Sequence, residues 1–169
     1  MNRGYTSHEI ANIVGGQCMG QQDVLINDFE IDSRRIHWGS RTLFIAIHSN
    51  RNDGHSFVAD AKARGVKCAL VQRILNIPGL TQILVDDSTV ALQKLAAHHR
   101  STFDIPILAI TGSNGKTIVK EWLNQLCAGH FRICRSPRSY NSQLGVPLSV
   151  LQMNESHTLA IIEAGISQT

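Results

Sequence analysis

The stretch "AITGSNGKTIVKEWL", residues 109–123, decides the fold. An apolar run ends in a turn that holds two glycines, Gly112 and Gly115, and a pattern with helical spacing follows. A strand that enters a helix through such a turn directs several backbone N–H groups, and the positive end of the helix dipole, at one point. Glycine permits the backbone angles and the close approach that a phosphate needs. The stretch therefore predicts a phosphate-binding loop between a strand and a helix.

The side chains of this loop suit a nucleotide. Lys116 supplies a mobile positive charge for the outer phosphates, and the Thr117 hydroxyl is placed to bind Mg²⁺. The spacing departs from the standard P-loop, because only Ser113 and Asn114 separate the glycines and Ile110 stands where the longer motif has glycine. The alternative is an ordinary glycine-rich turn between strand and helix. The chemistry of the motif favours phosphate binding.

Composition limits the other classes of function. The chain has 169 residues and is 43% hydrophobic, enough for one ordinary domain or two small ones. The net charge of +3 is small and scattered, without the basic run that nucleic-acid binding favours. The four cysteines form no CxxC pair, which indicates reduced thiols, and Cys68 and Cys127 lie in apolar patterns that predict burial. The start "MNRGYTSHEI" has no apolar segment of a signal peptide, and no apolar run reaches transmembrane length, so we expect a cytoplasmic protein without a membrane span.

Strand patterns alternate with helix patterns along the chain, which predicts an α/β fold with parallel sheets. Strands are expected at the start of 23–35 and in 42–47, 67–73, 81–87, 105–111, 131–136 and 158–165. Helices are expected from a capping box at Thr6 and Glu9 up to Gly15, and over 54–66, 87–100, 116–128 and 143–152. In the helix over 87–100, Ser88 is the expected N-cap, Val90, Leu92, Leu95 and Ala96 form the apolar side, and His98 and His99 are expected in solvent.

The helix that ends near residue 100 divides the chain. Residues 1–103 are predicted to form a small α/β domain, and residues 104–169 to begin a P-loop-type nucleotide-binding domain. Only about three strands belong to this second domain, whereas an open α/β sheet usually has more. We therefore expect the chain to stop inside its second domain.

Glu163 ends the apolar stretch "LAIIEAG", residues 159–165. Doubly wound sheets bind their ligands at the carboxyl ends of strands, so this carboxylate is expected beside the phosphate loop, where it could share Mg²⁺ with Thr117. The alternative is a solvated glutamate at a strand end.

Two further polar segments are ambiguous from the residues alone. In "SPRSYNSQLGVPLSV", residues 136–150, Asn141 and Ser142 offer donors and acceptors, but the residues alone favour a loop in which Asn141 or Ser142 caps a helix. In "DSRRI", residues 32–36, Ser33 and Arg34 could hold a phosphate or carboxylate, but the residues alone favour a solvated turn.

Taken together, these segments resemble the Mur ligases, the ATP-dependent amino-acid ligases of peptidoglycan synthesis. "TGSNGKT" is similar to their phosphate loop, "SYNSQLGVPLSV" to their asparagine-containing segment, and "EAG" to their Mg²⁺-binding glutamate segment. "DSRRI", "GSRTLFIAI" and "DGHSFVADAKARGV" resemble the amino-terminal uridine-nucleotide domain of the family. The sequences of the loop and of "SYNSQLGVPLSV" are most similar to those of the branch that adds D-alanyl-D-alanine to UDP-N-acetylmuramoyl-tripeptide, in particular a subgroup fused to an alanine racemase.

The resemblance implies a role for each segment. ATP would be bound by the loop that runs from Thr111 through Gly112, Ser113, Asn114, Gly115 and Lys116 to Thr117, and Mg²⁺ by Thr117 and Glu163. Lys116 and Glu163 would be the catalytic residues. Ser33 and Arg34 would contact the uridine nucleotide, and Asn141 and Ser142 the substrate side, although the family often has a second Asn where this chain has Ser142.

The implied enzyme is an ATP-dependent ligase. The substrate carboxylate would attack the ATP γ-phosphate to form an acyl phosphate, and the amine of D-alanyl-D-alanine would then displace phosphate. The carbamoylated lysine and the amine-binding domain of the family are not in this sequence, so the chain by itself is expected to be inactive. The alternatives are a neighbouring Mur-type ligase with another amine, a nucleotide-binding module without catalysis, and a P-loop hydrolase or kinase, which the shortened glycine spacing disfavours.

Overall fold

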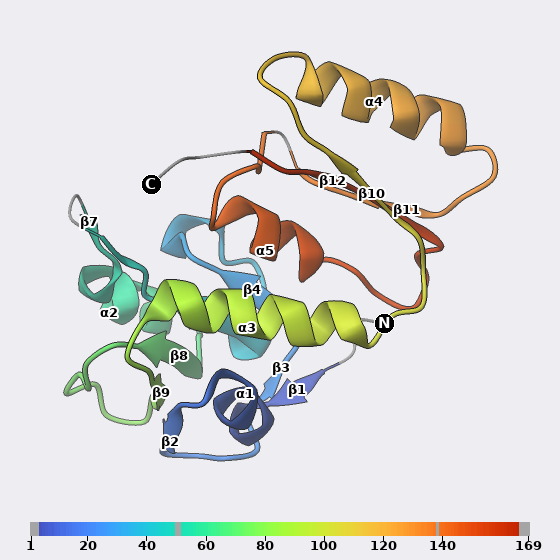
Figure 1. Cartoon of the computed structure of the whole chain (residues 1–169). Helices are drawn as coiled ribbons and strands as arrows, with labels where there is room; N and C mark the ends of the chain where they lie inside the picture. The colour runs from blue at the N-terminus through green and yellow to red at the C-terminus, as the bar shows by residue number, and fades with distance from the viewer. Residues whose placement is uncertain (1–3, 50–51, 138, 166–169) are drawn as a thin grey trace. The chain divides into compact units, whose positions relative to one another are not determined.

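The computed structural model describes residues 4–49, 52–137 and 139–165. The chain divides into two compact units, one of Gly4–Leu95 and one that contains Ala96–Thr169. Both are mixed α/β structures built on parallel strands, as the sequence predicts (Figure 1).

The unit of residues 4–95 contains a five-stranded sheet in the order β2-β9-β8-β5-β4. Its strands are β2 (Gln17–Met19), β4 (Asp28–Glu30), β5 (Thr42–Ile45), β8 (Cys68–Val71) and β9 (Thr81–Leu84). The pairs between β4, β5, β8 and β9 are parallel, whereas β2 is antiparallel to β9. Two short antiparallel pairs join β1 (Tyr5–Thr6) to β3 (Leu25–Ile26) and β6 (His48–Ser49) to β7 (Asn52–Asp53).

The central strands β5 and β8 are buried at every position. Parallel strands covered on both faces are expected as continuous apolar runs rather than as alternating patterns, which is why "TLFIAI" and "KCALVQR" could be recognised. Phe44, Ala69 and Val71 belong to one cluster with Val58 and Ala61 of helix α2 (Val58–Ala63). Cys68, fully buried here, has its pKa raised by desolvation, so its thiol stays protonated.

Helix α1 (Ser7–Val14) confirms the predicted capping box. The Thr6 hydroxyl accepts a hydrogen bond from the Glu9 amide at 3.1 Å, and the Glu9 carboxylate accepts one from the Thr6 amide at 2.7 Å. Gly15 ends the helix with a left-handed φ of 75°. Such reciprocal capping satisfies two of the donors that a helix start leaves unpaired. Short 3₁₀ helices cover Ser33–Arg35, Gly39–Arg41 and Gly54–Phe57, so the last of these replaces the first turn of the helix expected over 54–66.

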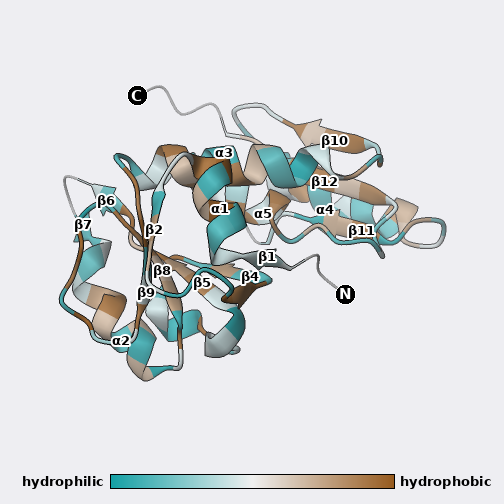
Figure 2. Ribbon diagram, turned by 90° about the horizontal axis from the view of Figure 1, so that it is seen from below, coloured by the Kyte–Doolittle hydropathy of each residue, from teal (hydrophilic) through white to brown (hydrophobic). Residues whose placement is uncertain are grey.

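Helix α3 (Ser88–Ser101) forms where the sequence predicts it, but its cap and its buried side differ from the expectation. Asp87 is the cap, because its carboxylate accepts from the amides of Thr89 and Val90 at 2.7 and 2.9 Å, while Ser88 is buried inside the first turn. Val90 is exposed, and the buried side runs through Ala91, Leu92, Leu95 and Ala96. The alternation of hydrophobic and polar segments along α3 is visible in Figure 2.

His99 lies on that buried side of α3 rather than in solvent. Its ring is within 2.9 Å of the Met153 carbonyl, a partner 54 residues away. A histidine at the i+4 position from Leu95 continues the buried face, and a distant carbonyl satisfies its ring nitrogen.

The unit of residues 96–169 contains a three-stranded parallel sheet in the order β10-β12-β11. The strands are β10 (Ile107–Ile110), β11 (Ile133–Arg135) and β12 (Leu159–Glu163). Helices α4 (Lys116–Cys127) and α5 (Gly145–Val150) lie on opposite sides of this sheet (Figure 1). Helix α5 is shorter than the expected 143–152. The central strand β12 is buried at all five positions and places its last residue at the edge from which α4 starts.

Several large apolar side chains of this unit face solvent. Leu108 of β10 and Ile118, Trp122 and Leu126 of α4 are between 40% and 76% exposed. Cys127, expected to be buried, is only partly so. Among the described residues, no helix combines the length and the hydropathy needed to cross a membrane.

Candidate nucleotide and metal site

The predicted phosphate loop is the connection between β10 and α4. Gly112 and Gly115 adopt positive φ angles of 140° and 78°, a region that residues with a side chain rarely adopt. Gly115 is the N-cap of α4, provides no side-chain cap, and has nothing within 4 Å of where a Cβ would be. The loop therefore leaves open space at a helix N-terminus, the feature by which proteins hold phosphate groups.

Lys116, the first residue of α4, lies along this loop. Its ammonium donates to the carbonyls of Gly112 at 2.6 Å and Ser113 at 3.4 Å. These carbonyls belong to the same turn, so the charge is held next to the loop that it would serve.

Thr117 and Glu163 come together although 46 residues separate them in sequence. The Thr117 hydroxyl donates to Glu163 Oε2 at 2.9 Å. The register explains the contact, because Ile110 pairs with Glu163 and both strands end at the same edge of the sheet. Glu163 is 1% exposed, so it is not the solvated strand-end glutamate of the alternative. The expected juxtaposition of these two side chains is present.

Asn141 holds the other oxygen of the same carboxylate. Its side-chain amide donates to Glu163 Oε1 at 2.8 Å, and its backbone carbonyl accepts from the Gly165 amide at 2.7 Å. A Cβ on Gly165 would lie 2.6 Å from that carbonyl oxygen, so glycine is needed for this approach.

Ser142 does not contact Glu163 through a hydrogen bond that the structure shows, and it bonds to the start of α5 instead. Its hydroxyl accepts from the Gly145 amide at 3.1 Å, at the start of α5. Ser142 therefore belongs to the turn that leads into α5, whose N-cap residue is Leu144, whereas Asn141 belongs to the Glu163 cluster.

Two residues of the cluster were missed by reasoning from sequence. Lys120 of α4 is fully buried, with its ammonium 3.6 Å from Glu163 Oε2 and 3.0 Å from the Ser136 carbonyl that accepts from it. Ser136 is also fully buried, and its hydroxyl accepts from the Glu163 amide at 3.0 Å. Lysine is almost never buried unless it is paired. The one signal in the sequence is that Lys120 follows Lys116 by four residues and so shares its side of the helix.

The residues predicted for the uridine nucleotide lie in the other unit, in the 3₁₀ turn Ser33–Arg35. Arg34 is exposed and forms a bidentate pair with Asp32 at 2.9 and 2.8 Å, which lowers the pKa of Asp32 below its ordinary value. Ser33 is buried, and its hydrogen bond to the Asp60 carboxylate is the main cause of the lowered pKa of Asp60. Arg34 is therefore the accessible member of the pair.

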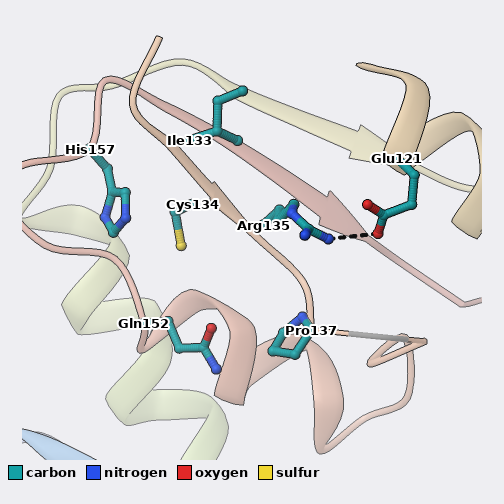
Figure 3. Close-up of a pocket in the computed structure, with 7 residues that line it drawn as sticks. All are labelled: Glu121, Ile133, Cys134, Arg135, Pro137, Gln152 and His157. Atoms are coloured by element: carbon teal, nitrogen blue, oxygen red, sulfur yellow. Dashed lines mark hydrogen bonds and ion pairs between the residues drawn. The ribbon is translucent and has the colours of Figure 1, made fainter. Parts of the chain in front are cut away.

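A pocket of about 560 Å³ lies beside the edge strand β11, lined by side chains that include Glu121, Arg135, Gln152 and His157 (Figure 3). Arg135 donates to Glu121 at 2.6 Å, so its charge is neutralised within the pocket wall. Burial lowers the pKa of His157. None of the pocket's lining residues is among the predicted site residues.

The donor set at Thr117 and Glu163 suits Mg²⁺. A hydroxyl and a carboxylate are hard oxygen ligands, and the Thr117 hydroxyl is at hydrogen-bond distance from the carboxylate next to an open phosphate loop.

The cluster of His48, Asp53 and His55 suits a metal less well. The Nε2 atom of His55 accepts from the Gln72 amide at 2.9 Å, so Nδ1 carries the proton and donates to Asp53 at 2.6 Å. Both ring nitrogens are thereby used, and Arg73 holds the other Asp53 oxygen at 2.6 Å.

Comparison with known proteins agrees with this arrangement. Residues 110–169 match the family model of the Mur ligase middle domain. Over 166 residues, the chain is 34% identical to the UDP-N-acetylmuramoyl-tripeptide–D-alanyl-D-alanine ligase of Bacillus subtilis. The aligned region covers 96% of this chain and 36% of that protein. A crystal structure of MurF from Acinetobacter baumannii superposes with a TM-score of 0.88 at 29% identity, covering 99% of this chain and 37% of that one. MurF from Thermotoga maritima, solved in complex with ADP, superposes with a TM-score of 0.72 at 29% identity, covering 88% of this chain and 34% of that one.

The chain spans about a third of the length of the curated relatives that it matches. Both the family model and the relatives point to the same group of enzymes. Residues 110–169 therefore resemble the Mur ligase middle domain, and the chain is similar to the MurF ligases over nearly its whole length.

Proposed function

We propose that this chain forms the nucleotide-binding part of an ATP-dependent ligase that adds D-alanyl-D-alanine to UDP-N-acetylmuramoyl-tripeptide in peptidoglycan synthesis. The observation that carries the proposal is the Thr117–Glu163 contact at the mouth of a phosphate loop. The similarity to MurF ligases supports the choice of substrates. ATP-dependent synthesis of this precursor places the enzyme in the cytoplasm.

We assign the two parts of the reaction to two domains. Residues 1–103 would bind the uridine nucleotide, with Arg34 exchanging its Asp32 partner for a phosphate while Ser33 shapes the turn. Residues 104–169 would form the first part of the ATP-binding domain, with the loop 111–117 around the phosphates.

In the proposed reaction, the carboxylate of the tripeptide substrate attacks the γ-phosphorus of ATP and ADP leaves. The amine of D-alanyl-D-alanine then attacks the acyl phosphate, and phosphate leaves as the amide bond forms. Lys116 and the N–H groups of the loop orient and stabilise the phosphoryl group, which is the main requirement of such a transfer. Thr117 and Glu163 would hold Mg²⁺, which neutralises phosphate charge when bound. Asn141 fixes the Glu163 carboxylate from its other side, and Ser142 sets the start of α5 beside the proposed substrate position.

Binding of ATP to this chain in the presence of Mg²⁺ tests the proposal. Lys116→Ala removes one charge-assisted contact to phosphate, so calorimetric titration should show a loss of about 1.5–3 kcal/mol in binding. Lys67→Ala, an exposed lysine in the other unit, is the matched control and should bind as the wild type does. Equal affinity of wild type and Lys116→Ala would refute the role of the loop.

A further inference from the structure

The fully buried Lys120 is the least expected feature of the cluster, because a charged group without water must be neutralised by its neighbours. Its ammonium lies 3.6 Å from Glu163 Oε2 and 3.5 Å from Glu121 Oε1, and it donates to the Ser136 carbonyl. Lys120 thereby connects helix α4 with the ends of β11 and β12. Any movement of Glu163 away from this position separates it from its cation.

The charges alternate in sign through this network. Arg135, in the wall of the pocket in Figure 3, donates to Glu121, Glu121 lies beside Lys120, and Lys120 lies beside Glu163. Two basic and two acidic groups therefore balance before any ligand binds. Thr117 is three residues from Lys120 on the same side of α4, so one helix face presents both a hydroxyl and a cation to the same carboxylate oxygen.

We infer that Lys120 is a positioning residue that couples metal binding at Glu163 to the arrival of the nucleotide. The inference rests on the proposed function. A divalent ion that approaches alone meets a carboxylate already neutralised at 3.6 Å by a buried ammonium, so it gains little. A triphosphate adds negative charge, which can neutralise the metal ion while the Lys120 ammonium stays beside Glu163. The site thus takes up its metal with the nucleotide and holds Glu163 in place until then.

The test is a titration of the chain with Mn²⁺, followed by electron paramagnetic resonance, with and without ATP. Lys120→Met removes the charge and the terminal nitrogen and keeps a straight side chain only one heavy atom shorter. A neighbouring opposite charge changes the acid dissociation constant of a carboxyl group by about 10- to 1000-fold. Lys120→Met should therefore bind Mn²⁺ alone about tenfold or more tightly than the wild type does, and the gain should vanish in the double variant Lys120→Met/Glu163→Gln. A purely structural lysine would not raise metal affinity when it is removed.

Lys67→Met is the control for loss of a lysine charge outside the site and should titrate as the wild type does. Lys120→Gln is a second neutral variant, whose amide can still donate to the Ser136 carbonyl; it should show the same gain. Circular dichroism establishes that each variant is folded. If neither neutral variant folds, Lys120 serves stability alone and the inference is overturned.

The outcomes separate this inference from the proposed function. Wild-type binding of Mn²⁺ with ATP, together with neutral variants that bind Mn²⁺ alone no better than the wild type, overturns the role of Lys120 and leaves the proposed function intact. A wild-type chain that binds neither ATP nor Mn²⁺ with ATP contradicts the proposed function, and this inference with it.

Discussion

At the residue scale, Glu163 depends on groups from two separate segments, helix α4 and the stretch that follows β11. Thr117 and Lys120 come from α4, Asn141 from the segment after β11, and the Ser136 hydroxyl accepts from the Glu163 amide. The residues with the clearest chemistry, Lys116, Thr117 and Glu163, could be predicted because their types and positions follow from what a phosphate and a metal need. Lys120 and Ser136 could not, since a lysine or serine in a sequence carries no mark of the distant partner that buries it.

Removing only one member of the buried pair should destabilise the unit. Glu163→Gln leaves the Lys120 ammonium without its nearest buried carboxylate, and breaking a buried ion pair in this way costs about 3–5 kcal/mol. The double variant Lys120→Met/Glu163→Gln removes both charges and should recover most of that loss. Urea unfolding of the wild type, the two single variants Lys120→Met and Glu163→Gln, and the double variant measures the free energy of unfolding of each. Additive losses in the double variant would contradict the pairing of the two side chains.

At the element scale, the parallel strands and their helices could be predicted because each is an apolar run or an amphipathic pattern between turn residues. Element ends were less predictable, as α3 shows: Asp87 and Ser88 are both good caps, and burial of Ser88 decides in favour of Asp87. Helix α5 begins at Gly145, two residues later than expected, after a turn in which the Ser142 hydroxyl accepts from the Gly145 amide. Such choices depend on packing between distant segments, which local pattern does not record.

Strand β4 contains a group that should make stability depend on pH. Desolvation raises the pKa of Glu30 to about 7, with Asp28 and Asp32 adding to the effect and Arg35 opposing it. Because the raised pKa belongs to the folded state, the folded chain binds more protons than the unfolded chain between pH 4.5 and 7, and stability should fall as the pH rises through that range. Glu30→Gln should flatten this part of the curve. Thermal unfolding at a series of pH values checks it, and an unchanged slope in the variant would rule out Glu30 as the cause.

At the scale of the whole molecule, the chain holds two α/β units but spans only about a third of the relatives that it matches. The division could be predicted from the helix that ends near residue 100 and the polar stretch that follows it. The exposure of apolar side chains on α4 and β10 could not be predicted. An apolar pattern in a strand or a helix predicts burial, and it does not show which of these side chains lack a covering segment.

The chain by itself should not form the amide bond. The proposed reaction needs a site for the D-alanyl-D-alanine amine, and this chain covers only 36% of the length of the Bacillus subtilis ligase to which it is similar. Release of phosphate should therefore remain at background when the chain is mixed with ATP, Mg²⁺, UDP-N-acetylmuramoyl-tripeptide and D-alanyl-D-alanine. Phosphate release that requires both substrates would show instead that the chain contains a complete ligase site.

The central claim is that Thr117 and Glu163 bind one metal ion beside nucleotide phosphates held by the loop 111–117. A crystal structure of the chain with Mn²⁺ and a non-hydrolysable ATP analogue tests it most directly, because anomalous scattering locates the manganese. The account predicts a manganese peak bound to Thr117 Oγ1 and Glu163, either directly or through one water, with the phosphates at the N-terminus of α4. Manganese and phosphates located elsewhere, with the 2.9 Å hydrogen bond between Thr117 and Glu163 retained, would contradict it.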